Sequence, residues 1–272
     1  MTQSERDRGI NRLRSRDRLA RFHHAIVRPF LRRHLRYSRL SLWLESLTHF
    51  SPQEHALDNV MRFASASAME GDYLEFGVYE GGTFAAAYHL AQRYGLRSMR
   101  FFAFDSFQGL PSPSGIDATP YQQFQQGQYA LDLASFNRSL RRHGVPQARI
   151  RIVPGWYDET LNETTRVLLG ISTAAVVWID CDLYRSAVPA LRFVTPLVTP
   201  GTIIVFDDWY AFRGDPRCGE QRAFREWLAQ NPTIGVQEFM SIGWHGKAFL
   251  IHSAPPSSMS PLPPDDNRPP AV

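Results

Sequence analysis

Between residues 51 and 253 of the 272-residue chain, short apolar runs alternate with segments whose apolar residues recur every three or four positions. Runs of the first kind predict buried strands, and segments of the second kind predict amphipathic helices. The strands predicted in this way cover residues 72–78, 100–107, 149–155, 174–181, 202–208, 235–242 and 246–252. The predicted helices cover residues 53–69, 82–95, 132–143, 158–170, 185–198 and 219–230.

The order of these elements predicts an α/β fold. Strands that alternate with helices form a parallel sheet that is covered by helices on both faces. The last two predicted strands are joined by a short connection, which predicts an antiparallel hairpin at one edge of the sheet. We therefore expect a Rossmann-like domain at residues 51–253, with about seven strands that are mostly parallel.

Two segments outside this domain have a different pattern. Residues 1–50 predict a basic helical extension, because residues 1–47 hold twelve arginines against four acidic side chains and their apolar residues recur at helical spacing. The extension is expected to pack on the domain or on a second subunit of a homodimer, or to lie on an anionic membrane surface. Nucleic acid is not an expected partner, since no DNA-binding motif is present. Residues 254–272 hold seven prolines and no apolar periodicity, which predicts a disordered tail.

Composition limits the class of protein further. Hydrophobic residues make up 43% of the chain and charged residues 21%, as is typical of a globular domain. The two cysteines are too few for a disulfide framework, no secretory signal opens the sequence, and no apolar run is long enough to span a bilayer. We therefore expect a cytoplasmic protein.

The glycine-rich sequence EFGVYEGGTF follows the first predicted strand and opens a helix. Gly77, Gly81 and Gly82 permit a tight turn and the close approach of a ligand. Thr83 lies near the helix N-terminus, where backbone amides are free to bind polar groups. The spacing differs from the G-x-G-x-x-G dinucleotide fingerprint, so NAD is not the expected cofactor.

An acidic residue, Asp105, ends the second predicted strand. An acid at this position of a nucleotide-binding sheet can bind both hydroxyls of a ribose. Alternatively, Asp105 caps the turn that follows it, with help from Ser106. Together with the glycine-rich loop, this acid favours an adenosine-containing ligand.

Three further carboxylates end the fourth and fifth predicted strands. Asp180 lies at the end of the fourth strand, and Asp207 and Asp208 lie at the end of the fifth in the sequence IIVFDDWY. If the two strands are neighbours, these side chains meet at the edge of the sheet where ligands bind. Asp182 is a further candidate, although strand alternation places it beyond the strand end.

Such a cluster of like charges must be neutralised in some way. Protonation, pairing with an arginine such as Arg185 or Arg213, and a bound cation are the alternatives. Because all the candidate ligands are oxygens, a cation would be a hard one such as Mg²⁺. Neither cysteine has partners at zinc-binding spacing.

The motifs E-x-G-x-x-x-G-G, FDSFQGLP, DCDLY and DDW occur in this order along the chain. In this combination, residues 50–252 resemble the macrocin O-methyltransferase (TylF-like) family of class I methyltransferases. Members of this family use S-adenosylmethionine to methylate sugar hydroxyls of natural products. The resemblance therefore implies an O-methyltransferase whose acceptor is a saccharide, on a secondary metabolite or a glycan precursor. Catechol O-methyltransferases are similar more distantly and share the metal arrangement.

The resemblance also implies a role for each matching residue in cofactor binding. The methionine portion of S-adenosylmethionine would be surrounded by Glu75, Gly77, Tyr79, Gly81 and Thr83, with Gly82 in the same loop. The ribose hydroxyls would be held by Asp105, with Ser106 nearby. The adenine would be flanked by Trp156 and Tyr157.

For the metal, the resemblance implies Asp180, Asp207 and Asp208 as ligands, and it favours Asp180 over Asp182. The catechol enzymes carry a lysine three residues after the first metal aspartate, but Leu183 occupies that position here. We therefore assign the role of catalytic base to Asp180.

The long segment at residues 110–132 is rich in tyrosine and glutamine, including Tyr121, Gln122 and Tyr129. It is too long for a simple connection, and we interpret it either as a lid over a sugar acceptor or as a disordered polar loop. Trp209 is expected to face the acceptor or to cover the site. The alternative to an enzyme is a non-catalytic binding module that keeps the cofactor pocket and docks through its basic N-terminus.

Overall fold

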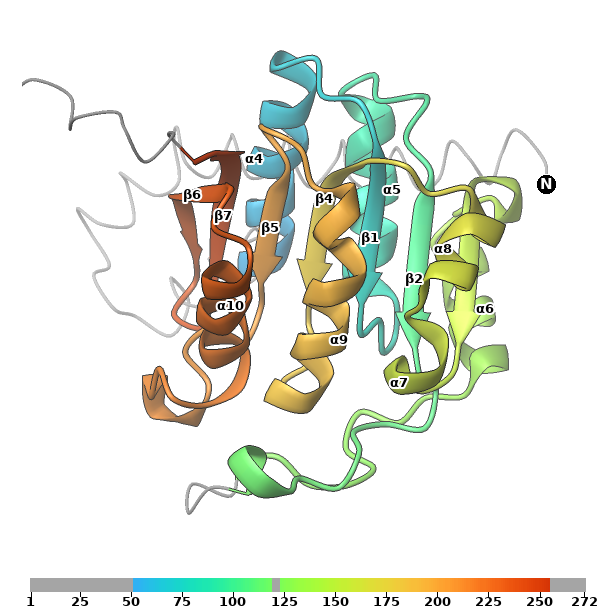
Figure 1. Ribbon diagram of the computed structural model, residues 1–272. Helices are drawn as coiled ribbons and strands as arrows, with labels where there is room; N and C mark the ends of the chain where they lie inside the picture. The colour runs from blue at the N-terminus through green and yellow to red at the C-terminus, as the bar shows by residue number, and fades with distance from the viewer. Residues whose placement is uncertain (1–50, 119–122, 255–272) are drawn as a thin grey trace, which may run out of the picture.

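A seven-stranded sheet forms the centre of the protein, in the order β3-β2-β1-β4-β5-β7-β6 (Figure 1). The computed structural model describes residues 51–118 and 123–254, so the predicted extension at 1–50 and almost all of the predicted tail lie outside the described residues. Strands β1 to β5 are parallel, whereas β7 pairs antiparallel with both β5 and β6. The predicted mostly parallel sheet with an antiparallel edge hairpin is therefore confirmed.

The elements follow one another in the predicted alternation. The strands are β1 (Asp72–Phe76), β2 (Phe101–Asp105), β3 (Ile150–Pro154), β4 (Ala174–Ile179), β5 (Ile203–Phe206), β6 (Ile234–Ile242) and β7 (Gly246–Ser253). The α-helices are α4 (Pro52–Ala66), α5 (Gly82–Arg93), α6 (Leu133–Arg142), α7 (Tyr157–Thr160), α8 (Glu163–Leu169), α9 (Tyr184–Val194) and α10 (Gly219–Gln230). The short 3-10 helices are η2 (Gly115–Asp117), η3 (Gln147–Arg149), η4 (Thr195–Leu197) and η5 (Phe212–Gly214).

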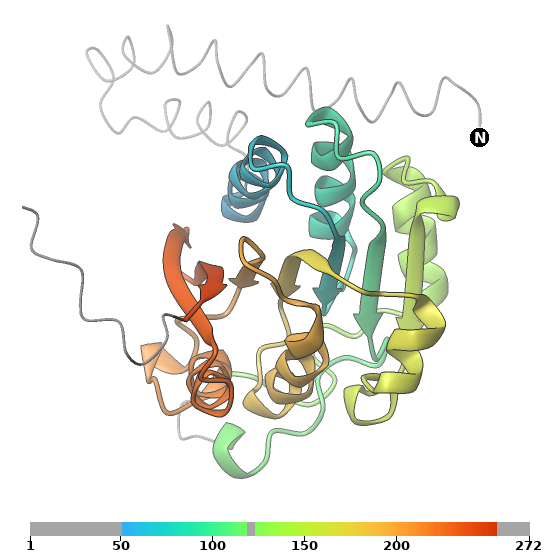
Figure 2. The ribbon, with the colours of Figure 1, turned by 45° about the horizontal axis from the view of Figure 1, so that its top comes forward.

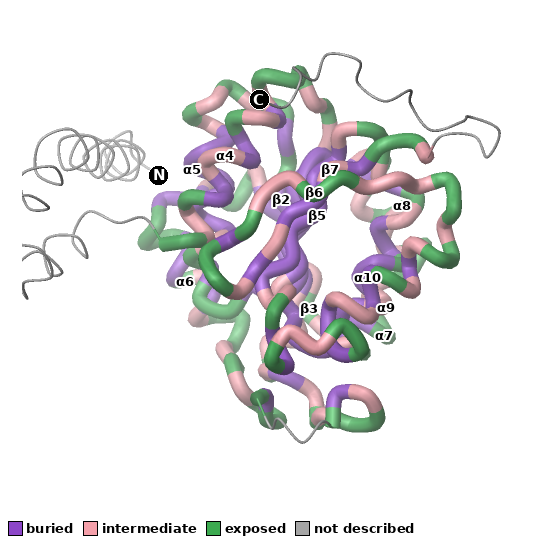
Figure 3. Tube along the Cα trace, turned by 90° about the vertical axis from the view of Figure 1, so that its left-hand side faces the viewer, coloured by how far each residue is buried: buried purple, intermediate pink, exposed green. Residues whose placement is uncertain are grey.

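Helices cover both faces of the sheet, as Figure 2 shows. Successive strand residues point to opposite faces, so Tyr73 of β1 packs with α4 and α5 while Leu74 packs with α9. The inner strands β1, β2, β4 and β5 are consequently buried along almost their whole length, whereas the edge strands β3 and β6 are mostly partly buried or exposed (Figure 3). Burial of apolar side chains in two core layers provides the main stabilisation of this architecture.

Some element boundaries differ from the sequence-based expectation, and two of these differences bear on the site. The segment predicted as a single helix at 158–170 forms two helices, α7 and α8. The side chain of Asn162 caps the N-terminus of α8, because it accepts a hydrogen bond from the backbone N–H of Thr165 at 2.9 Å. The strands β4 and β5 also end earlier than predicted, at Ile179 and Phe206. The aspartates that follow them therefore belong to loops at the edge of the sheet.

The long loop after β2 is anchored on both sides of its undescribed residues 119–122, which include Tyr121 and Gln122. On one side, the carboxylate of Asp117 accepts hydrogen bonds from the backbone N–H groups of Tyr184 and Arg185, at 2.7 and 3.1 Å. On the other side, Gln123 accepts a hydrogen bond from the backbone of Phe212 at 2.7 Å. The interpretation of this segment as a disordered loop is therefore wrong for residues 110–118 and 123–132, which the structure describes.

The carboxyl ends of the five parallel strands meet at one edge of the sheet, and the long loop crosses beneath this edge (Figure 1). The chain runs outward from β1 through β2 to β3 and then crosses to β4 and β5, so the strand order reverses between β1 and β4. Ligands bind beside such a reversal in open α/β sheets.

No helix within residues 51–118 and 123–254 combines the length and apolar character needed to cross a membrane.

Candidate functional site

A cavity of about 690 Å³ opens at the carboxyl edge of the sheet, beside the reversal of strand order. It is lined by residues from the loops after all five parallel strands. Every site residue that we predicted lines this one cavity: Glu75, Gly77, Tyr79, Gly81, Gly82, Thr83, Asp105, Ser106, Trp156, Tyr157, Asp180, Asp207 and Asp208.

The glycine-rich loop approaches the end of β4 very closely at Gly77. A Cβ atom on Gly77 would lie 1.8 Å from the carbonyl oxygen of Asp180, and the residue has a φ angle of +86°. Both the contact and the backbone conformation therefore require glycine. Gly82 is different, since a Cβ atom there would meet no atom within 4 Å.

Asp105 connects the first two loops of the cavity. One carboxylate oxygen accepts a hydrogen bond from the backbone N–H of Val78 at 2.8 Å, and the other accepts one from Phe107 at 2.7 Å. Ser106 continues the turn by accepting a hydrogen bond from the N–H of Gln108 at 3.0 Å. The predicted turn-capping role is thus present, and each carboxylate oxygen keeps a further lone pair for a ligand hydroxyl.

Glu75 lies at the bottom of the cavity, on β1. Its side chain is buried and accepts a hydrogen bond from the hydroxyl of Tyr73 at 2.5 Å. Burial raises the pKa of Glu75 well above its ordinary value, and the charges of Asp207 and Asp105 raise it further.

The two aromatic residues predicted to flank an adenine have different environments. Trp156 is partly exposed at the beginning of α7 and is free to contact a ligand. Tyr157 is buried in the core, where its ring packs edge-on against Phe76 and its hydroxyl donates to the carbonyl of Phe104 at 3.1 Å. The sequence did not distinguish these roles, because the two residues are adjacent.

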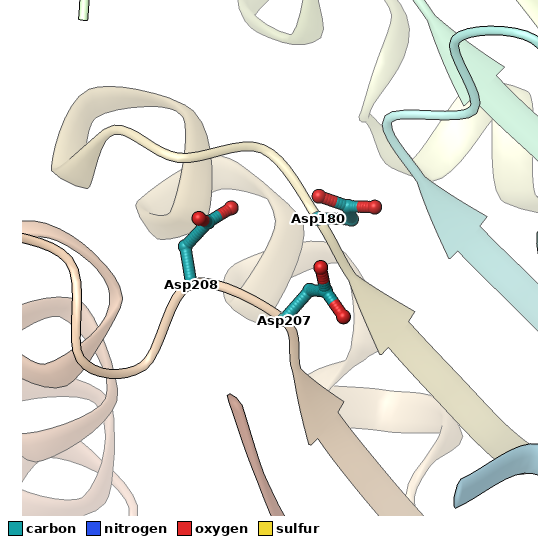
Figure 4. Close-up of side chains that lie close together, drawn as sticks. All are labelled: Asp180, Asp207 and Asp208. Carbon is teal, nitrogen blue, oxygen red and sulfur yellow. The ribbon is translucent and has the colours of Figure 1, made fainter. Parts of the chain in front are cut away.

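The three predicted metal ligands come together at the ends of two neighbouring strands. Figure 4 shows Asp180 just past the end of β4, and Asp207 and Asp208 just past the end of β5. One carboxylate oxygen from each residue lies within 4.8 Å of the others. The pairing of β4 with β5 in parallel register produces this arrangement, since Ile179 lies opposite Phe206.

Burial and mutual repulsion dominate the electrostatics of this cluster. Burial, followed by the charges of Asp207 and Asp208, raises the pKa of Asp180 well above its ordinary value. Burial and the neighbouring Asp208 raise the pKa of Asp207 to about 6. Asp182 is also buried, and burial followed by the charge of Asp208 raises its pKa well above its ordinary value. These raised pKa values mean that the cluster is costly to ionise fully unless a cation or protons offset the repulsion.

Three residues that the sequence did not reveal also contact the cluster. Glu220 of α10 is buried and accepts a hydrogen bond from the backbone N–H of Asp208 at 3.1 Å. His245 donates from Nδ1 to the carbonyl of Asp207 at 2.8 Å, because a carbonyl oxygen can only accept. Gln53 donates to the carboxylate of Asp207 at 3.3 Å. These contacts orient Asp207 and the peptide that follows it.

Two expectations about nearby side chains can be compared with the structure. Arg185 pairs with Asp158 at 3.9 Å, and both residues line the same cavity as the aspartate cluster. Trp209 neither faces the cavity nor covers it, so that prediction was wrong. Its ring packs in the core against Phe206 and Phe249, with centroid distances of 5.2 and 4.8 Å.

The cluster fits a hard divalent cation on structural grounds. Its ligand atoms are all carboxylate oxygens, which Mg²⁺ prefers. The Oδ1 atom of Asp207 is buried without a hydrogen-bond partner, which is costly for a carboxylate unless an ion or a proton satisfies it.

Comparison with known proteins agrees with this geometry. The model of the macrocin O-methyltransferase (TylF) family matches residues 53–234. Over 171 residues, the chain is 28% identical to an 8-demethyl-8-(2,3-dimethoxy-alpha-L-rhamnosyl)-tetracenomycin-C 4'-O-methyltransferase of Streptomyces olivaceus, covering 60% of this chain and 64% of the relative. It is also 28% identical over 173 residues to a mycinamicin III 3''-O-methyltransferase of Micromonospora griseorubida, covering 61% and 63%. The aligned region thus spans slightly less than two thirds of each relative.

Solved structures show the same fold. The O-methyltransferase NovP aligns with a TM-score of 0.61 and 22% identity, over 73% of this chain and 79% of that one. The calicheamicin methyltransferase CalS11 aligns with a TM-score of 0.61 and 22% identity, over 88% of this chain and 91% of that one. The fold is therefore that of the class I S-adenosylmethionine-dependent methyltransferases, and the chain belongs to the macrocin O-methyltransferase (TylF) family.

Proposed function

We propose that this protein is an S-adenosylmethionine-dependent O-methyltransferase that uses Mg²⁺ and methylates a hydroxyl group of a saccharide. The observation that carries the proposal is the position of the aspartate cluster. Asp180, Asp207 and Asp208 line the same cavity as the glycine-rich loop and Asp105. A cation held there would lie beside the cofactor, where an acceptor hydroxyl must be placed for methyl transfer.

The acceptor class is supported by the relatives. The tetracenomycin enzyme of Streptomyces olivaceus is named for a rhamnosyl compound and for a 4'-hydroxyl position, and the Micromonospora enzyme for a 3''-hydroxyl position of mycinamicin III. We infer a saccharide acceptor for this chain from that similarity together with the acidic site, since vicinal hydroxyls are good ligands for a hard cation.

The cofactor would be held by the loops after β1, β2 and β3. Gly77 brings the backbone of the first loop against β4, and the N-terminus of α5 at Gly82 presents free amides to the cavity. Asp105 would accept hydrogen bonds from the ribose hydroxyls, and the partly exposed Trp156 would contact the adenine. Bound S-adenosylmethionine would supply the electrophilic methyl group for a direct displacement.

The aspartates would prepare the acceptor. Bound Mg²⁺ would supply Lewis-acid stabilisation of the negative charge that develops on the acceptor hydroxyl. Asp180 accepts the hydroxyl proton in our proposal, because it lies within the cluster and Leu183 replaces the lysine of the catechol enzymes. Glu220 and His245 hold the N–H and the carbonyl of the peptide between Asp207 and Asp208 and so keep the carboxylates aligned.

This proposal is tested by mass spectrometry of small molecules from the cell's own extract, incubated with the purified protein and S-adenosylmethionine. With Mg²⁺ we expect products that are 14 Da heavier than their precursors, since one methyl group replaces one hydrogen. In EDTA we expect the yield to fall by about a hundredfold or more, because a metal-stabilised alkoxide is worth several kcal/mol. Equal yields under both conditions would contradict the role of the metal, and the absence of any methylated product would contradict the enzyme.

A further inference from the structure

Two tyrosines in the cavity have backbone conformations that are unfavourable for any residue except glycine. Tyr79 has a φ angle of +38°, and Tyr129 has one of +60°. A bulky residue in this region costs on the order of 1–3 kcal/mol, and such outliers concentrate at functional sites. The surrounding structure must therefore hold both residues in place.

The backbone around Tyr129 is held by contacts within the long loop. Leu110 donates a hydrogen bond to the carbonyl of Gln128 at 2.9 Å, and Gly127 donates one to the carbonyl of Leu110 at 2.9 Å. Gly109 permits this close approach, since a Cβ atom there would lie 2.7 Å from the carbonyl oxygen of Gln128. The start and the end of the loop thus form one fixed unit, and Tyr129 follows directly after it.

The rings of the two tyrosines meet across the cavity. Their centroids are 5.7 Å apart with an interplanar angle of 71°, the edge-to-face arrangement that aromatic rings prefer. Tyr79 remains 46% exposed and Tyr129 remains 48% exposed, and both line the cavity. The pair therefore presents an unoccupied aromatic face instead of filling the core.

Tyr129 faces the cavity that the acidic cluster also lines. Its pKa is raised by burial and by the negative charges of Asp182, Asp208 and Asp180. These three aspartates, Asp182 included, line the same cavity as Tyr129. An acceptor whose hydroxyl is bound at the aspartates would have the rest of its ring beside Tyr129.

From this arrangement we propose that Tyr129, supported edge-on by Tyr79, is the platform on which the apolar face of the acceptor sugar ring stacks. This inference rests on the proposed function, because it takes the acceptor to be a saccharide. A rigid aromatic side chain provides a large contact area at little entropic cost. Tyr129 would thus decide which acceptors bind, whereas the cofactor and the cation would be held by other residues.

The test compares Tyr129→Ala and Tyr129→Phe with the wild type, using methyl α-L-rhamnopyranoside as the probe in the presence of S-adenosylhomocysteine and Mg²⁺. Binding is measured by saturation-transfer NMR and the cofactor dissociation constant by calorimetry. We expect Tyr129→Ala to weaken probe binding about tenfold, which corresponds to about 1.4 kcal/mol, and Tyr129→Phe to remain within about threefold of the wild type. The affinity for S-adenosylhomocysteine should not change in either variant. Leu133→Ala is the control, since this partly exposed residue follows the same loop and does not line the cavity.

Three results would overturn the inference. The first is unchanged probe binding in Tyr129→Ala. The second is a loss of probe affinity in Tyr129→Phe equal to that in Tyr129→Ala, which would assign the effect to the hydroxyl group. The third is a wild-type protein that does not bind the probe. Methylation of the extract by each variant separates this inference from the proposed function. If Tyr129→Ala methylates the extract at the same rate as the wild type, the platform is wrong while the enzyme stands. If the wild type gives no methylated product, the proposed function itself fails.

Discussion

Replacing Asp207 with asparagine is expected to lower kcat by about a thousandfold or more while making the metal-free protein more stable. The amide keeps the size of the carboxylate and can still accept the hydrogen bond from Gln53. It removes one charge from a cluster in which burial and Asp208 raise the pKa of Asp207 from 3.8 to about 6. This pKa difference lowers the free energy of unfolding at neutral pH by about 3 kcal/mol. In a domain of this size each kcal/mol shifts the Tm by roughly 2–4 °C, so we expect a rise of several degrees.

The pH dependence follows from the direction of this shift. Because the pKa of Asp207 is higher in the folded protein than in the unfolded chain, the folded protein binds more protons between pH 4 and pH 6. The contribution of Asp207 to stability is therefore fully present below pH 4 and is lost as the pH rises through 6. The Tm advantage of Asp207→Asn over the wild type should accordingly be small at pH 4 and fully developed at pH 7. Mg²⁺ should raise the Tm of the wild type more at pH 8 than at pH 5, since it competes with protons for the carboxylates.

Thermal unfolding with and without Mg²⁺ measures these effects, and calorimetry with S-adenosylhomocysteine should show an unchanged cofactor affinity. Glu163→Gln is the matched control, because this acidic side chain on α8 is 81% exposed and lies outside the cavity. It should change neither the Tm nor the response to Mg²⁺. An Asp207→Asn variant that keeps full turnover, or that still gains stability from Mg²⁺ as the wild type does, would contradict the role of Asp207.

Among substitutions that add one methyl group in the cavity, Gly77→Ala is expected to lower the free energy of unfolding most. The new Cβ atom would lie 1.8 Å from the carbonyl oxygen of Asp180 and 2.8 Å from its carbonyl carbon, and φ is +86°. Both are backbone atoms of Asp180, which directly follows β4, and Gly77 directly follows β1, so the clash can be relieved only by moving the ends of these two paired strands apart. We expect a loss of about 4 kcal/mol or more in the free energy of unfolding, and loss of S-adenosylhomocysteine binding.

Gly82→Ala provides the comparison within the same loop. Its Cβ atom would meet nothing within 4 Å, and Gly82 begins α5. Alanine is a better helix former than glycine, so the free energy of unfolding should stay equal or rise by up to about 1 kcal/mol. Urea unfolding of the two variants measures the difference. If Gly77→Ala were as stable as Gly82→Ala, the close approach of the loop to β4 would not exist in solution.

The fold and most of the candidate site could be predicted because the sequence signals are local. Apolar runs and helical periodicity identified the elements, and polar residues at the strand ends identified the cavity. The aspartate cluster followed from one further assumption, that β4 and β5 are neighbours, which the strand order confirms. Register then places Ile179 opposite Phe206 and brings the following residues together.

The remaining parts of the site depend on contacts between distant segments. Gln53 contacts Asp207 across 154 positions of sequence, and His245 does so across 38. Glu220 has the position of an ordinary acidic residue in the first turn of a helix, and only the packing of α10 brings it to Asp208. Trp209 was misjudged for the opposite reason, since adjacency in sequence to Asp208 says nothing of the direction in which its ring points. Tyr129 was recognised only as one of several aromatic residues in a long loop.

Anomalous diffraction gives the sharpest test of whether the three aspartates hold a divalent cation beside the cofactor. Crystals grown with S-adenosylhomocysteine and Mn²⁺, which occupies the same kind of oxygen site as Mg²⁺, would be measured near the manganese absorption edge. We predict one strong anomalous peak about 2.2 Å from oxygens of Asp180, Asp207 and Asp208, at the edge of the cavity that holds the cofactor. A cofactor-bound crystal with no peak there, or with manganese bound only elsewhere, would contradict the claim.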